Sequence, residues 1–98
     1  MPSPHADALL LPESLQTFLQ NALPETIEEL EAQIAQIQKV QDQCSRTIRE
    51  LMEREDPLHG VAFAAEIHQM HQQKNMLETH KEFRRVRIRR LRLAEEIF

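Results

Sequence analysis

Hydrophobic residues recur with helical spacing through the middle of the chain. Between Pro24 and Pro57 they alternate at intervals of three and four residues, at Ile27, Leu30, Ile34, Ile37, Cys44, Ile48 and Leu51. Four heptads contain eight core positions, and these residues fill seven of them. Gln41 occupies the eighth. This pattern is typical of a coiled coil or a helical bundle. We therefore predict a helix over residues 25–55, which begins after Pro24.

A second long stretch without Pro or Gly follows the sequence Asp56-Pro57-Leu58-His59-Gly60. It predicts a turn over residues 56–60 and a helix over residues 61–97. Part of this stretch, residues 86–93, alternates like a β-strand, but a lone strand would lack a partner. A short turn makes the two helices antiparallel neighbours. Folding at this turn pairs residues whose numbers sum to about 113, so Ile37 meets Met76, Leu30 meets Phe83, and Gln41 meets Gln72 and Gln73.

A shorter amphipathic pattern precedes the pair. The stretch from Glu13 to Leu23 has apolar residues on one helical face, at Leu15, Phe18, Leu19, Ala22 and Leu23. We predict two parts: a loose segment with this short helix (residues 1–24) and a helical hairpin (residues 25–98). We expect the short helix to pack over the tail from Arg89 to Phe98, which overshoots the start of the first long helix. The expected fold class is all-α.

Two helices joined by one seam enclose little core, and small chains usually need a metal, disulfides or oligomerisation for stability. On the first long helix, the positions that flank the core positions are unusually uncharged. They are Thr26, Gln33, Gln38, Val40, Ser45, Thr47 and Met52. A wide neutral stripe favours a bundle over a two-stranded coil. We therefore predict either a homodimer that forms a four-helix bundle or a hairpin that docks on a different protein.

Composition excludes several classes of site. One Gly in 98 residues excludes a glycine-rich phosphate loop and disfavours an all-β fold. One Cys excludes an intramolecular disulfide and a cysteine-based zinc site. The chain has no apolar run long enough to span a membrane and does not begin like a secretory signal. These features lead us to expect a cytoplasmic, reducing compartment and no cofactor.

Charge is divided unequally along the chain. Residues 1–56 carry a net charge of −7 and residues 57–98 a net charge of +3. The basic part contains a cluster of arginines: Arg84, Arg85, Arg87, Arg89, Arg90 and Arg92. Such a cluster could bind nucleic acid. It could also be neutralised inside the chain, because the hairpin brings it beside Glu25, Glu28, Glu29 and Glu31.

Candidate catalytic and metal-binding residues are few. His68 and His71 lie one helical turn apart but lack the acidic residues of known di-metal or zincin motifs. Cys44 falls in the predicted seam, where a thiol behaves as a small apolar group. We therefore predict no enzymatic activity.

The sequence favours a protein–protein interaction module, such as an adaptor, assembly factor, chaperone-like partner or inhibitor. The alternative is a small nucleic-acid-binding regulator that uses the arginine cluster. The predicted interaction residues are Ile34, Ile37, Val40, Ile48, Met52, Leu91, Ile97 and Phe98, with Leu9, Leu10 and Leu11 as a further apolar group. Whether the partner is the same chain or another protein stays open.

Overall fold

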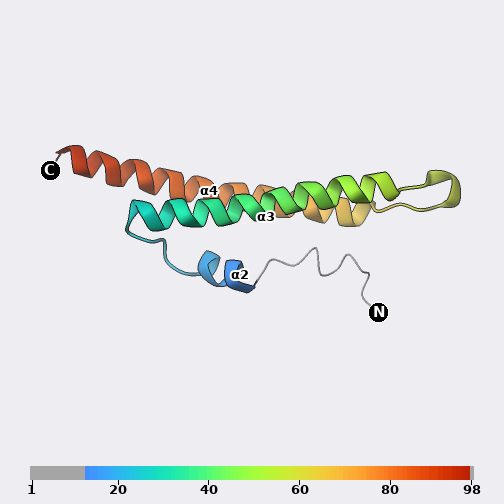
Figure 1. Ribbon diagram of the computed structural model, residues 1–98, viewed down its shortest axis with the longest axis horizontal. Coiled ribbons are helices and arrows are strands. Elements are labelled where there is room, and N and C mark those ends of the chain that lie inside the picture. Colours follow the sequence, from blue (N-terminus) through green and yellow to red (C-terminus); the bar gives the residue numbers. More distant parts are fainter. Residues whose placement is uncertain (1–12, 98) are drawn as a thin grey trace.

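Three α-helices account for most of residues 13–97, the part of the chain that the computed structural model describes. They are α2 (Glu13–Gln20), α3 (Ile27–Arg54) and α4 (Ala64–Ile97), and no strand occurs among these residues. Helices α3 and α4 run antiparallel and pack against each other (Figure 1). The molecule is elongated, with dimensions of 65, 23 and 15 Å. The predicted all-helical fold with a long helix pair is therefore confirmed.

Helix α3 begins at a side-chain cap. The hydroxyl of Thr26 accepts a hydrogen bond of 3.2 Å from the backbone N–H of Glu29, which satisfies one of the unpaired donors at the helix start. Glu28 and Glu29 lie in the first turn, where negative charge complements the helix dipole. These interactions explain why α3 begins two residues after the proline-glutamate pair at 24–25.

The chain reverses over nine residues, from Glu55 to Phe63, and this segment includes the 3-10 helix η1 (Pro57–His59). Asp56 and Val61 exchange two backbone hydrogen bonds of 2.9 Å across the reversal. Gly60 has φ 71°, a left-handed conformation that glycine adopts at little cost. The reversal is thus longer than the five-residue turn that the sequence predicts.

The longer reversal changes the register of α4 against α3. The side-chain pairs Gln33–Arg84, Gln38–Lys81 and Gln41–Glu78 have residue numbers that sum to between 117 and 119, and not to about 113. A shift of about five residues rotates a helix face by about 140°. The predicted pairing of Ile37 with Met76 and of Leu30 with Phe83 is therefore wrong, and Met76 and Phe83 are 41% and 52% exposed.

The seam combines apolar residues with three polar ones. On α3 the buried residues are Leu30, Ile37, Gln41, Cys44, Ile48 and Leu51. On α4 they are Met70, Leu77, Lys81, Arg84 and Ile88. All six buried residues of α3 lie at predicted core positions, whereas the α4 side includes two cations, Lys81 and Arg84, that the predicted pairing did not contain.

Helix α2 packs on the middle of the helix pair. Its Leu15, 3% exposed, forms a core cluster with Ile37 and Leu77, and Phe18 and Leu19 pack beside them. The expected position over the α4 tail is therefore wrong, and the tail residues Leu93 and Ile97 are 56% and 66% exposed. Figure 1 shows α4 extending past the first turn of α3, with α2 beside the middle of the pair. Leu9–Leu11 and Phe98 lie outside the described residues.

Candidate interaction site

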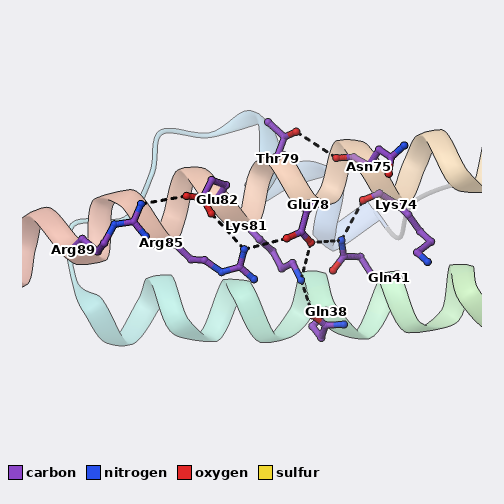
Figure 2. A network of polar contacts seen from close by, with 10 residues as sticks. All are labelled: Gln38, Gln41, Lys74, Asn75, Glu78, Thr79, Lys81, Glu82, Arg85 and Arg89. Atoms are coloured by element: carbon purple, nitrogen blue, oxygen red, sulfur yellow. Dashed lines mark hydrogen bonds and ion pairs between the residues drawn. The ribbon is translucent and has the colours of Figure 1, made fainter.

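A polar layer interrupts the seam near its centre (Figure 2). Gln41 is only 6% exposed, and its Nε2 donates to the carbonyl oxygen of Lys74 at 3.1 Å and to Oε2 of Glu78 at 3.0 Å. Beside it, the buried Cys44 thiol lies 4.0 Å from Oε1 of Gln73. Both hydrogen bonds of Gln41 depend on the observed register, so the layer helps to fix it.

The layer continues through Lys81, which is 4% exposed. Its Nζ donates to Oε1 of Gln38 at 2.6 Å and forms an ion pair of 3.0 Å with Oε2 of Glu78. A buried ammonium needs such partners because burial removes its hydration. Glu78 therefore connects the polar groups of α3 and α4.

The Glu78 carboxylate has an unusually low pKa. Hydrogen bonds from Gln41, Lys81 and Arg85 lower its pKa from the ordinary 4.5 to about 2. The side chain is nevertheless 53% exposed, so solvent screening reduces the energy of these contacts. The carboxylate is ionised at neutral pH and accepts hydrogen bonds from both helices.

We expect Glu78 to give the fold a modest dependence on pH. A carboxylate with a lowered folded-state pKa stabilises the fold above its unfolded pKa of 4.5 and loses that effect as the pH falls toward about 2. Glu78→Gln should therefore cost about 0.5–1 kcal/mol near neutral pH and progressively less in acid. Urea unfolding followed by far-UV circular dichroism measures this difference. The control is Glu50→Gln on the exposed face of α3, and an equal pH dependence in both variants would contradict the assignment.

Arg84 is the most deeply buried charged residue described, at 1% exposed. Its Nε donates to Oε1 of Gln33 at 2.9 Å, and one terminal N–H donates to the carbonyl oxygen of His80 at 2.8 Å. The guanidinium also lies over the Phe18 ring, 5.4 Å from the centroid. Burial lowers the pKa of Arg84. Arg84 therefore joins α2, α3 and α4 at one point.

Most of the remaining arginine cluster also has partners within the chain. Arg85 pairs with Glu78 at 3.1 Å and Glu82 at 3.5 Å, and Arg89 pairs with Glu82 at 3.2 Å. Across the seam, Arg92 pairs with Glu31 at 3.2 Å. The two others, Arg87 and Arg90, line a shallow surface depression with Glu25 and Leu91. The hairpin thus brings Glu31 of α3 to Arg92 and Glu25 near Arg87 and Arg90, whereas Arg85 and Arg89 pair with glutamates of α4 itself.

An apolar stripe remains exposed on the outer side of α4. The outward stripe is formed by residues that alternate at intervals of three and four along α4. Its members are Met76, Thr79, Phe83, Val86, Arg90, Leu93 and Ile97. Its centre lies about 160° around the helix from the seam positions, at 100° per residue. Four of its members, Met76, Phe83, Leu93 and Ile97, are 41–66% exposed. Helix α4 therefore has two apolar faces, and only one of them packs against α3.

The predicted interaction residues occupy different environments. Ile37 and Ile48 are buried in the chain's own seam, and Val40 packs against both buried clusters. Ile34 and Leu91 are half-buried, and each lines a shallow depression together with arginines of the cluster. Met52 is 58% exposed at the far end of α3, and Ile97 belongs to the outward stripe. The structure does not bring these residues together into one surface.

Other candidate chemical groups lie apart. His68 and His71 are exposed on α4, whereas Cys44 is buried and burial raises the pKa of its thiol. Within residues 13–97, no three His, Cys, Asp or Glu side chains are grouped so that they could hold a metal ion. No helix in this range is long and apolar enough to cross a membrane.

Sequence reasoning missed the outward stripe because it assigned Met76 and Phe83 to the seam. The sequence of α4 contains two heptad patterns of apolar residues, one through Met76 and the other, one residue further along, through Leu77. The true seam pattern contains Lys74, Lys81 and Arg84, so a count of apolar residues favours the other pattern.

Comparisons with protein-family models, curated proteins and solved structures found no match to this chain.

Proposed function

We propose that this protein is a non-enzymatic helical interaction module that binds a partner helix along the outward stripe of α4. The observation that carries the proposal is the heptad spacing of exposed apolar side chains on a helix whose opposite face is already packed. Exposed apolar residues gathered on one face are typical of protein-binding surfaces. A partner helix that supplies matching apolar residues would remove this stripe from water.

The arginine cluster supports this proposal over the nucleic-acid alternative. Arg84 is buried, and Arg85, Arg89 and Arg92 are paired with glutamates. A nucleic-acid surface would instead present unpaired cations to phosphates. The acidic side chains around the cluster would oppose the approach of a phosphate backbone.

The predicted assembly of two copies into a bundle of four long helices is one form that such a module can take. The outward stripe adds a constraint to that prediction. A helix docked on it would lie on the far side of α4 from α3, and the seam between α3 and α4 would stay intact. Binding would therefore add helices beside the hairpin without opening it.

Three methionines provide a test of this surface. Met76 lies on the outward stripe, Met52 is exposed elsewhere, and Met70 is fully buried. Oxidation of exposed methionine by dilute peroxide adds one oxygen that mass spectrometry detects. In a native extract of the source cells, we expect Met76 to be protected as strongly as Met70, while Met52 is oxidised.

The matched comparison is the same protein, unfolded in urea, where all three methionines should oxidise at similar rates. Oxidation of Met76 as fast as Met52, both in the extract and in concentrated purified protein, would contradict the proposal. Selective protection of Met52 would also contradict it, since the covered surface would then lie at the end of α3.

A further inference from the structure

We propose that the helix bound on the outward stripe is α4 of a second copy of this chain, packed antiparallel to the first. This inference rests on the proposed function and adds the identity of the partner. Two observations lead to it: the order of side chains along the stripe, and the charges beside the stripe. Each of them matches the same feature of a second copy that runs in the opposite direction.

Antiparallel packing matches large apolar residues with one another. With the two-fold axis between residues 84 and 85, facing positions have numbers that sum to 169. Phe83 then meets the partner's Val86, and Met76 meets the partner's Leu93. Each contact occurs twice by symmetry. Four apolar layers thus form within the stretch 76–93, which is about 27 Å long.

The polar members of the stripe favour the antiparallel direction. In this register Arg90 faces the partner's Thr79, and both are polar residues near the ends of the paired stretch. A parallel arrangement in register would instead place Arg90 against the partner's Arg90. Like charges that face each other across a helix pair oppose association. The single arginine in the stripe therefore selects the antiparallel direction.

Charges along one edge of the stripe are also complementary. Glu82 and Arg89 lie one heptad apart on this edge, and they pair with each other at 3.2 Å within one chain. In the antiparallel register, Glu82 lies beside the partner's Arg89, and Arg89 lies beside the partner's Glu82. Two symmetric ion pairs would flank the apolar layers, in the manner of the flanking positions of coiled coils.

The other edge of the stripe accommodates the same register. There His80 lies beside the partner's Arg87. Burial, and then the nearby Arg84 charge, lower the pKa of His80, so its imidazole is neutral at pH 7. A neutral ring next to a cation does not repel it. Neither edge therefore places like charges together at neutral pH.

Charge reversal tests the register. Glu82→Arg should weaken self-association about tenfold or more, because it turns two ion pairs into two repulsions. The double variant Glu82→Arg with Arg89→Glu should restore association to within a few fold. Sedimentation equilibrium over a dilution series measures each constant, and circular dichroism checks that each variant is folded. Glu50→Arg, which makes the same charge change on an exposed site of α3, is the control.

Cysteine cross-linking tests the direction independently. In a Cys44→Ala background, we expect a mixture of Phe83→Cys and Val86→Cys chains to form mixed disulfide dimers under mild oxidation. Either variant alone should cross-link less. Efficient cross-linking of Phe83→Cys chains with one another would indicate parallel packing and overturn the proposed arrangement.

The methionine experiment separates this inference from the proposed function. If a second copy covers the stripe, Met76 of the purified protein becomes protected as concentration rises. A purified protein that stays monomeric, with Met76 protected only in the extract, would overturn the dimer and leave a different partner for the stripe. Oxidation of Met76 in both settings would overturn both proposals.

Discussion

Ile37→Asp is expected to abolish cooperative folding of this chain. Ile37 is fully buried where α2, α3 and α4 meet, and it contacts the cluster that contains Leu15 and Leu77. The substitution removes about 2–3 kcal/mol of apolar burial and places a carboxylate among apolar groups, which costs several kcal/mol more. Small domains are stable by only about 5 kcal/mol. We therefore expect far-UV circular dichroism to show no folding transition in urea.

Gln36→Asp is the matched control for this experiment. Gln36 is the preceding residue of α3, and its side chain is exposed. The same carboxylate there should cost less than about 1 kcal/mol, because only the difference in helix propensity between glutamine and aspartate is lost. If both substitutions had similar small effects, the seam would not be the stabilising core of the molecule. If both abolished folding, helix propensity would outweigh burial.

At Arg84 we expect a hydrophobic substitute to preserve the fold better than a charged one. Methionine keeps a long stem in the space between the helices and removes the cost of burying a charge. Arg84→Met should therefore change stability by less than about 1.5 kcal/mol, as volume-conserving substitutions do. Arg84→Lys should cost more, because an ammonium is strongly hydrated and lacks the planar fork that reaches several partners.

Arg84→Ala provides the lower limit of this series. It removes the stem as well as the charge and leaves a cavity where three helices meet, at an expected cost of about 2–4 kcal/mol. Urea unfolding of all three variants gives the order of stability. The expected order, from most to least stable, places Met first and Ala last. If Arg84→Lys were more stable than Arg84→Met, the positive charge itself would stabilise this site.

The heptad pattern of α3 was sufficient to predict its face in the seam. Leu30, Ile37, Cys44, Ile48 and Leu51 all occupy the buried positions that the sequence indicates. The prediction succeeded because this helix has one apolar face, and seven of the eight core positions over its four heptads are apolar. The reversal at Gly60 was predictable for a similar reason, since only one glycine exists.

Helix α4 could not be assigned in the same way because it carries two apolar patterns. The pattern through Met76 and Phe83 has more apolar residues near the C-terminal end, but the pattern through Lys81 and Arg84 packs against α3. Periodicity counts side chains by polarity, whereas these cations are stabilised by hydrogen bonds to specific groups. The position of α2 was missed for a related reason, since its apolar face could pack against several parts of the pair.

The length of the reversal decides which pattern of α4 faces inward. Each residue added to or removed from the segment between Glu55 and Phe63 would turn the face of α4 by about 100°. If the reversal used about five fewer residues and those residues joined the start of α4, Met76 and Phe83 would lie against α3, in a rival packing that hydrophobicity alone does not exclude. That rival would separate Lys81 and Arg84 from the glutamines that they now contact. The buried cations thus favour one register of α4 over the other. Burying two charges costs stability, but it excludes the rival packing.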